Sequence, residues 1–210
     1  MRVRGIRRLL SRVRSNAYLP ERYWESRAAE LVEVYDAPET WDARGWMRTG
    51  VEESVVPNLL RQCGAQTVIV PGAGSGRQYG LLAAEGFAPR GFDISPSLVA
   101  VCRERYPEVE TRLGSVVDAD AHESPADAVY TSGVLQHVAP DEIGRAVTAL
   151  RSLARRVIVI RELTVLTQSS AYQFAHDYNA LFEGWTEIHR ETTDDRETVR
   201  VELIAWAPAS

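Results

Sequence analysis

Three glycines at alternate positions, Gly72, Gly74 and Gly76, follow the apolar stretch that begins at Thr67. Glycine lets the backbone turn sharply and approach a ligand where a Cβ would intervene. A helix predicted just after this turn exposes its first amide N–H groups beside it, and such groups bind polar ligand atoms. Asp93 ends the next apolar stretch, where a carboxylate can accept two hydrogen bonds from a ribose diol. Together these residues predict a site for an adenosine-containing ligand.

The spacing of these glycines separates two classes of nucleotide-binding protein. Dinucleotide-binding enzymes carry G-x-G-x-x-G or G-x-G-x-x-A after the first strand, but the sixth position counted from Gly72 is Arg77. A side chain of this size would obstruct the close packing of helix on strand that the dinucleotide pattern requires. The observed G-x-G-x-G form instead resembles motif I of the class I S-adenosylmethionine-dependent methyltransferases.

Three further segments carry the same resemblance, in the order that the family has them. Gly91-Phe92-Asp93-Ile94 resembles the end of the second strand, where the acid holds the ribose hydroxyls. Asp127 to Tyr130, followed by Ser132 to Val138, resembles the fourth strand and its turn, and Arg156 to Ile160 resembles the fifth strand. The resemblance covers Val51 to Pro208 and implies S-adenosyl-L-methionine as the cofactor.

The chain departs from the family pattern at two places. The family has an acid two residues before the first glycine, where this chain has Val70; Pro71 follows, and the resulting Val-Pro-Gly form resembles the thiopurine and halide methyltransferase branch. Ser115 stands where an acid of the third strand contacts the adenine amino group, and Asp118 follows three residues later. The positions that the resemblance assigns to the cofactor are Gly72, Ala73, Gly74, Gly76, Asp93, Ile94, Ser115, Val116, Asp118, Ser132 and Gly133.

Two histidines are candidates to accept the proton of a hydroxyl acceptor, because histidine titrates nearest to neutral pH. His137 directly follows the predicted fourth strand, and His176 lies beside Asp177 in an aromatic segment after the fifth. Each has a structural alternative: His137 can pack within its turn, and His176 with Asp177 can form a surface pair. We predict His137, His176 and Asp177 as the catalytic candidates. Their spacing, with Glu162 included, matches no metal-ligand pattern, so no metal is predicted.

The apolar patterning places these residues on one α/β fold. Alternating strands and helices from Thr67 to Ile160 predict a Rossmann-like, doubly wound sheet whose ligands bind beyond the carboxyl ends of the strands. The alternating stretches Thr186 to Arg190 and Thr198 to Trp206, with polar Thr192 to Arg196 between them, predict an antiparallel hairpin. The expected fold is a seven-stranded sheet, parallel except for this C-terminal hairpin. Helices are predicted over Pro20 to Tyr35, Arg48 to Gln62 and Gln78 to Glu85, and others start at Ser95-Pro96 and at Pro140-Asp141.

We divide the chain into an arginine-rich arm, residues 1–16, and one methyltransferase domain, residues 17–210. Within the domain, residues 17–50 form a predicted helical cap and residues 51–210 the Rossmann-like core. The arm can lie on an anionic surface, bind nucleic acid or an anionic substrate, or stay solvated. Trp24, Trp41 and Trp46 fall in the cap, where they can stack on a sugar or flat ring or be buried in the core.

Composition limits the class of protein. The 210 residues carry a net charge of −5 at pH 7 and 45% hydrophobic residues, with no apolar run of membrane-spanning length. Outside the basic arm the chain is acidic, which argues against a broad nucleic-acid surface. Every basic side chain is arginine, which indicates a G+C-rich genome and hence a bacterial protein; we expect it in the cytoplasm.

The function predicted from these features is methylation of a small molecule by S-adenosylmethionine. Our first expectation is O-methylation of a saccharide or natural-product hydroxyl, supported by the cap aromatics and by polar groups such as Gln168, Asp177 and Asn179. N- or S-methylation is the nearest alternative. From other classes, a nucleotide-dependent oxidoreductase and an inactive cofactor-binding module stay open. The oligomeric state is not predicted.

Overall fold

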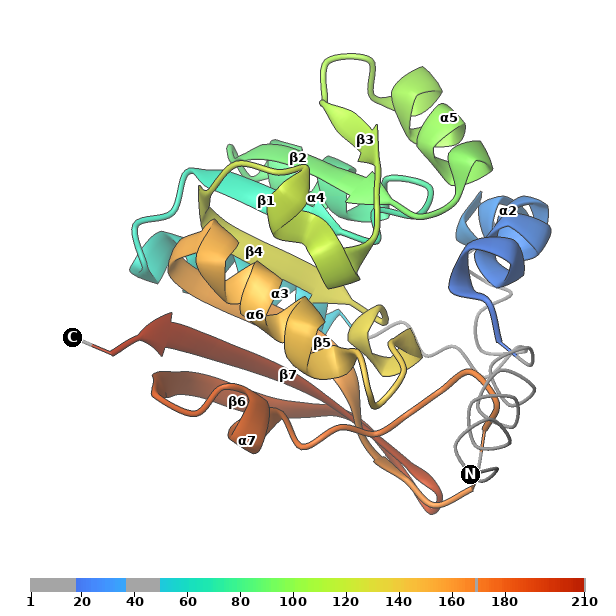
Figure 1. Cartoon of the computed structure of the whole chain (residues 1–210). Helices are drawn as coiled ribbons and strands as arrows, with labels where there is room; N and C mark the ends of the chain where they lie inside the picture. Colours follow the sequence, from blue (N-terminus) through green and yellow to red (C-terminus); the bar gives the residue numbers. More distant parts are fainter. Residues whose placement is uncertain (1–17, 37–49, 169, 210) are drawn as a thin grey trace, which may run out of the picture.

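The computed structural model describes residues 18–36, 50–168 and 170–209. The predicted arm and residues 37–49 of the predicted cap, with Trp41 and Trp46, lie outside the described residues. Seven strands form one sheet in the order β3-β2-β1-β4-β5-β7-β6 (Figure 1). β1 to β5 run parallel to one another, and β7 is antiparallel to both β5 and β6. The predicted fold class is confirmed.

The strands alternate with helices along the chain, which is why the central strands are parallel. The strands are β1 (Thr67–Pro71), β2 (Ala88–Asp93), β3 (Thr111–Leu113), β4 (Ala126–Ser132), β5 (Ala154–Leu166), β6 (Trp185–Arg196) and β7 (Val199–Pro208). The helices are α2 (Pro20–Asp36), α3 (Val51–Gln62), α4 (Arg77–Ala84), α5 (Pro96–Arg105), α6 (Ile143–Leu153) and α7 (Tyr178–Leu181), with 3₁₀ turns η3 (Val116–Ala121) and η4 (Leu135–His137).

Apolar side chains on the two faces of the sheet form two cores. On one face, α6 and η3 pack over Ile69, Val129 and Ile158. On the other face, α3 and α4 pack over Val68 and Tyr130. Because neighbouring residues of a strand point to opposite faces, Val68 and Ile69 serve opposite cores. Strands covered on both faces are therefore apolar throughout, as β1 and the middle of β5 are.

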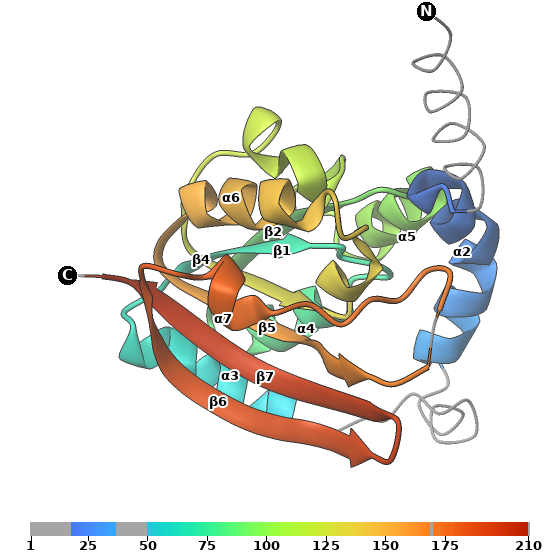
Figure 2. The same ribbon diagram turned by 60° about the horizontal axis from the view of Figure 1, so that its bottom comes forward.

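The C-terminal hairpin is longer than predicted. β6 runs through the polar residues Thr192 to Arg196, which were expected to form the turn, and only residues 197 and 198 connect the strands. Pairing with β7 along this length satisfies the backbone N–H and C=O groups of these residues, although their polar side chains do not mark them as a strand in the sequence. β5 likewise continues from Ile160 to Leu166, because β7 pairs with it from Ile158 to Leu166. Figure 2 shows the hairpin extending along one side of the sheet.

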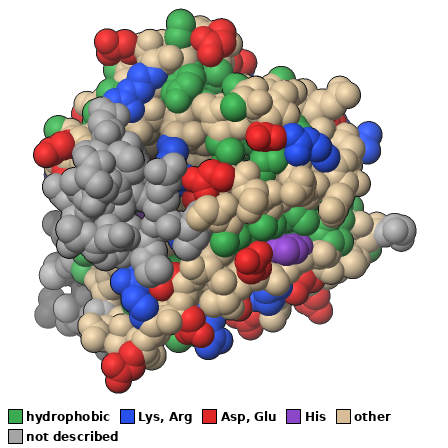
Figure 3. Space-filling model, turned by 180° about the vertical axis from the view of Figure 1, so that it is seen from behind, with side chains coloured by type: hydrophobic (Ala, Val, Ile, Leu, Met, Phe, Trp, Pro, Cys, Tyr) green, Lys and Arg blue, Asp and Glu red, His purple; other side chains and the backbone are tan. Residues whose placement is uncertain are grey.

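Helix α2 lies at the end of the sheet beside α5 (Figures 1 and 2). Ala28 and Leu31 of α2 pack against Leu98 of α5. Glu25 fastens the two helices, because its carboxylate accepts hydrogen bonds from the hydroxyls of Ser95 and Ser97. None of the described helices is long and apolar enough to cross a membrane. On the face seen in Figure 3, acidic and basic side chains are interspersed.

Candidate active site

The glycine turn has a backbone that other residues do not readily adopt. Gly72, Gly74 and Gly76 have φ angles of 62°, 58° and 88°, in the left-handed region. A Cβ on Gly72 would lie 2.3 Å from Cγ2 of Val134. The amide of Ala73 donates to the carbonyl of Phe92 at the end of β2 (3.0 Å), so the turn stays close to that strand. Glycine is therefore required at Gly72 both for the left-handed backbone conformation and because a side chain would collide with Val134.

Asp93 sits where the resemblance requires it, at the end of β2 beside the glycine turn. Its Oδ2 accepts from the amide of Gly74 and its Oδ1 from the amide of Ser95, both at 2.9 Å. The residue is only 6% exposed but lines the cavity described below. Burial raises the pKa of Asp93, while the amides of Ser95 and Gly74 oppose the rise. Each carboxylate oxygen keeps acceptor capacity for one more hydrogen bond.

A second acid, Glu162 on β5, organises the segment after β4. Its Oε1 accepts from the amides of Val134 (2.9 Å) and Leu135 (3.0 Å), and its Oε2 accepts from the amide of Gln136 (3.1 Å). Glu162 is fully buried, and burial raises its pKa to about 7 although these three amides favour the charged form. The sequence analysis considered Glu162 only as a metal ligand. An acid directly after the apolar run Val157 to Ile160 and Arg161, in a strand predicted to be buried, was the available signal for a structural role.

His137 is buried beside this segment with both ring nitrogens engaged. Nδ1 lies 2.6 Å from the carbonyl oxygen of Tyr172 and must donate its proton there. Nε2 lies 3.2 Å from the side-chain amide nitrogen of Gln136 and is therefore the acceptor nitrogen of a neutral ring. Trp24 packs edge-on against the imidazole. Burial lowers the pKa of His137 to about 4.

His176 and Asp177, adjacent in sequence, perform different tasks. Nε2 of His176 lies 3.1 Å from the carbonyl oxygens of both Leu135 and Val138, so it donates to the segment that follows β4. Asp177 caps α7, accepting from the amide of Ala180 (3.1 Å). Among the described residues that line the cavity, His137 is present but His176 and Asp177 are not. Gln168 and Asn179 are also absent from the lining of the cavity, and the side-chain oxygen of Asn179 accepts a hydrogen bond from Arg190.

One cavity of about 950 Å³ joins most of the predicted cofactor positions at the carboxyl ends of the strands. This volume lies in the range of small-molecule sites. Ala73 and Gly76 shape the turn without lining the cavity, whereas the other predicted positions line it. They are Gly72, Gly74, Asp93, Ile94, Ser115, Val116, Asp118, Ser132 and Gly133.

Aromatic side chains from two distant segments line the same cavity. Tyr23 of α2 stacks on Tyr172, with ring centroids 4.8 Å apart, and Trp24 lies edge-on to Tyr23 at 5.0 Å. Tyr18 donates to the carbonyl oxygen of His137 (3.2 Å). We call Tyr18, Tyr23, Trp24 and Tyr172 the aromatic wall. The sequence analysis named Trp24 but could not place it in one wall with Tyr172, which lies far along the chain and stacks on Tyr23.

The part of the chain that the structure describes contains no group of three or more His, Cys, Asp or Glu residues that could hold a metal ion.

The comparison with protein families matches residues 68–156 to the family described as "Methyltransferase domain". This stretch runs from β1 to the start of β5 and includes the glycine turn, Asp93 and His137. This match agrees with the resemblance to the class I S-adenosylmethionine-dependent methyltransferases, which implies S-adenosylmethionine as the cofactor.

Individual relatives are distant from this chain. A probable S-adenosylmethionine-dependent methyltransferase of Mycolicibacterium smegmatis is 29% identical over 93 residues, which are 44% of this chain and 35% of that protein. The chain thus matches only about a third of the length of this curated relative.

Solved structures of methyltransferases share the fold at low sequence identity. Magnesium protoporphyrin IX methyltransferase from Synechocystis, with bound S-adenosylmethionine, has a TM-score of 0.67 at 18% identity, covering 92% of this chain and 100% of that one. A 1,6-didemethyltoxoflavin-N1-methyltransferase from Burkholderia thailandensis has a TM-score of 0.63 at 17% identity, covering 92% of each chain. These likenesses concern the fold.

The described residues fit S-adenosylmethionine. A Cβ on Gly72 would clash with Val134 and close the turn, so the cradle exists only because glycine is present. Asp93 offers a carboxylate fixed by two amides for a ribose diol. Phe92, Leu98 and Val116 provide apolar surface for an adenine ring beside Ser115 and Asp118.

Proposed function

We propose that this chain transfers the methyl group of S-adenosylmethionine to a hydroxyl oxygen of a small molecule, a saccharide or other natural product. The observation that carries the proposal is the continuity of one cavity from Asp93 and the glycine turn to the aromatic wall. One part of this cavity suits the adenosine of the cofactor. The other offers flat apolar rings with polar edges, which suit a sugar or planar ring system.

Asp93 would accept hydrogen bonds from the ribose hydroxyls of the cofactor, and the residues around Ser115 would hold its adenine. The glycine turn would hold its methionyl part. This arrangement directs the methyl group toward the segment 132–137 and the aromatic wall. When bound, the cofactor supplies an electrophilic methyl carbon on a positively charged sulfur.

In this reaction the acceptor oxygen bonds to the methyl carbon as the carbon–sulfur bond breaks, and the hydroxyl proton leaves the oxygen. Holding the two reactants in line can lower the barrier by about 7–11 kcal/mol in favourable cases. His137 is our proposed proton acceptor, because it alone of the three catalytic candidates lines the cavity; Nε2 would take the proton in exchange for the hydrogen bond that it accepts from Gln136. Its low pKa keeps Nε2 unprotonated at neutral pH but makes it a weak base, so alignment carries most of the rate enhancement.

The proposal is tested by incubating the protein with S-adenosylmethionine and a panel of sugars, phenols, amines and thiols, with mass detection of products. A product 14 mass units heavier, from a sugar or phenol hydroxyl, supports it. Methylation confined to amines or thiols overturns the choice of oxygen and favours the N- or S-methyltransferase alternative. Turnover of NADH without methyl transfer would favour an oxidoreductase. Binding of S-adenosylhomocysteine without any turnover would favour a cofactor-binding module.

A further inference from the structure

The C-terminal hairpin contributes a buried carboxylate to the cavity. Asp194, on β6, is only 6% exposed and lines the cavity. Its Oδ2 lies 2.6 Å from Nη2 of Arg196, two residues along the same strand. The Arg196 side chain is the more exposed of the two, so the acid is the deeper member of this ion pair.

Asp194 stands on a face of the hairpin that is otherwise mostly apolar. Directly opposed residues of antiparallel strands point to the same face of a sheet. Asp194 is paired with Val201 of β7, which is paired in turn with Leu163 of β5, and all three line the cavity. The next row of paired residues also lines it and consists of Leu166, Val199 and Arg196.

This face lies on the side of β4 away from the ribose acid. The order of the sheet puts β5, β7 and β6 on one side of β4, and β1, β2 and β3 on the other. Asp93 ends β2, so the adenosine part of the cofactor falls on the opposite side of β4 from Asp194. The hairpin face therefore belongs to the acceptor end of the cavity.

The surroundings of Asp194 favour hydroxyl donors over a cationic amine. A carboxylate can accept about four hydrogen bonds, and the contact with Arg196 engages only Oδ2. The same contact balances the negative charge, and Arg161 of β5 also lines the cavity, so a protonated amine would gain little attraction. Leu163 and Val201 offer apolar surface beside the acid. This combination suits a saccharide ring, which has hydroxyl groups at its edge and C–H groups on its faces.

The other polar residues of the chain leave this recognition to Asp194. Gln168, Asp177 and Asn179, which the sequence analysis expected to contact hydroxyl groups, do not line the cavity. Four further described carboxylates do line it, on α2, β2 and η3 and just before α6: Glu21, Asp93, Asp118 and Glu142. Among the described residues, Asp194 is thus the cavity-lining carboxylate that the hairpin contributes.

We propose that the Asp194 carboxylate accepts hydrogen bonds from ring hydroxyls of a saccharide acceptor, other than the hydroxyl that is methylated. Asp194 thereby selects hydroxylated rings over deoxygenated ones. This inference rests on the proposed function and adds the residue that recognises the acceptor. Asp194 determines specificity and does not take the proton. The ion pair with Arg196 holds the carboxylate in place, which reduces the side-chain ordering that binding requires.

The test is steady-state methylation of the methyl glycosides of glucose, galactose, mannose and rhamnose, with saturating S-adenosylmethionine and detection of S-adenosylhomocysteine. The glycoside that is methylated fastest is then compared with each of its monodeoxy analogues. For the wild-type protein we expect at least one analogue to lose about tenfold or more in kcat/KM, because a hydrogen bond to a charged group is lost. The loss should appear mainly in KM, since this contact is made equally in the ground state and in the transition state.

Asp194→Asn assigns this preference to the carboxylate. The variant should raise KM for the parent glycoside about tenfold and leave kcat within about threefold. Its affinity for S-adenosylhomocysteine, measured by calorimetry, should stay within about twofold of the wild type. The sensitive monodeoxy analogue should lose little further activity in the variant, because the partner of the missing hydroxyl has been removed as well. If Asp194→Asn does not fold, Asp194→Ser replaces it in the same comparison.

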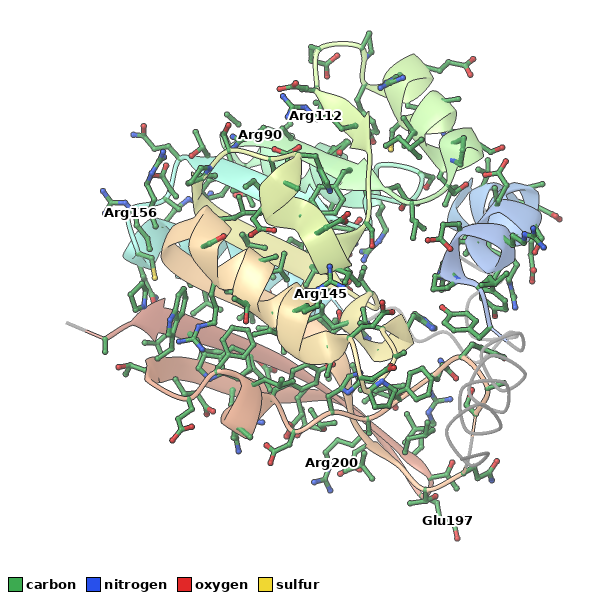
Figure 4. The ribbon with its side chains drawn as sticks, in the orientation of Figure 1. Arg90, Arg112, Arg145, Arg156, Glu197 and Arg200 are labelled. Atoms are coloured by element: carbon green, nitrogen blue, oxygen red, sulfur yellow. The ribbon has the colours of Figure 1, made fainter. Side chains whose placement is uncertain are left out.

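The matched control is Asp195→Asn, which makes the same change of charge at the neighbouring position. Asp195 points to the opposite face of β6, does not line the cavity, and lies exposed with Oδ2 3.3 Å from Nη2 of Arg200. Figure 4 shows Arg200 and Glu197 at the end of the hairpin. The control should change neither KM nor kcat for any of the glycosides.

Two results would overturn the proposal while leaving methyl transfer to a saccharide intact. One is a wild-type protein for which no monodeoxy analogue loses activity, or an Asp194 variant with unchanged KM. The other is an Asp194 variant in which removal of the hydroxyl costs as much as in the wild type, or in which S-adenosylhomocysteine binds more weakly. Asp194 would then be a structural support of the hairpin. A wild-type protein that methylates none of the glycosides would overturn the saccharide assignment together with this proposal.

Discussion

Replacing Glu162 by glutamine tests how burial and hydrogen bonding compete at the turn that follows β4. Glutamine keeps the shape of the side chain but cannot ionise, and its NH₂ group faces one of the three backbone amides that Glu162 accepts. That mismatch costs about 1–3 kcal/mol of stability. The cost does not depend on pH, because neither the glutamine side chain nor a backbone amide titrates in the range tested. The pH-dependent part of the difference therefore isolates the ionisation of Glu162.

The size of that part follows from the pKa of Glu162, which burial raises from 4.5 to about 7. A carboxyl group with a raised pKa binds its proton more tightly in the folded state, so its contribution to stability is complete below pH 4.5. That contribution is lost as the pH rises to 7. The loss amounts to about 3 kcal/mol in total, of which about 2–3 kcal/mol falls between pH 5 and pH 8. The glutamine variant lacks this loss.

The assay is urea unfolding of the wild type and Glu162→Gln at pH 5 and pH 8, followed by circular dichroism. We expect the free energy of unfolding of the wild type, relative to the variant, to fall by about 2–3 kcal/mol from pH 5 to pH 8. Other titrating groups are common to both proteins and cancel. A difference that stays constant, or that moves in favour of the wild type as pH rises, would refute the reasoning. It would mean that the three amide donors outweigh burial.

Four further predictions concern the cavity. Asp93→Ala should weaken S-adenosylhomocysteine binding by about 3 kcal/mol or more, because two charge-assisted hydrogen bonds are lost; unchanged affinity in calorimetry would contradict its role. Gly74→Val should abolish cofactor binding, since its φ of 58° strains any side chain, and a folded variant that binds normally would show that the turn is not the cradle. Trp24→Ala should raise KM for the acceptor but leave cofactor affinity within twofold, and the reverse pattern would place Trp24 at the cofactor. Turnover should fall below about pH 4 as His137 is protonated, and His137→Gln should remove this acid limb; a limb that persists belongs to another group.

The backbone geometry of the proposed cofactor site could be predicted from sequence because its signals are local. Glycines at Gly72, Gly74 and Gly76 are demanded by the backbone angles of one short turn. The acid of Asp93 lies at the end of the adjacent strand in a βαβ unit, whose connections bring successive parallel strands side by side. Apolar runs mark strands covered on both faces, so the order of the central elements was also predictable.

The histidines show where local sequence ceases to be enough. His176 and Asp177 are neighbours in the chain, and both were catalytic candidates. In the structure the His176 ring donates to carbonyl oxygens of the turn after β4, whereas the Asp177 carboxylate caps α7. Side chains at adjacent positions diverge, and their directions depend on the packing of the whole segment. The burial that lowers the pKa of His137 likewise comes from α2 and from the segment around Tyr172.

The amino-acid sequence by itself predicted the glycine turn, the strand that ends at Asp93 and the fold class, because turn chemistry and strand periodicity act over a few residues; the cofactor followed from the resemblance that these segments carry. Only the tertiary structure decided which distant side chains share the cavity. It paired Tyr23 with Tyr172, placed Glu162 under three amides, and brought Glu52 to Arg77 and Tyr130. These contacts join residues up to 149 positions apart. The packing of α2 against α5 and of α3 on one face of the sheet places Tyr23 and Glu52, and no local pattern records that packing.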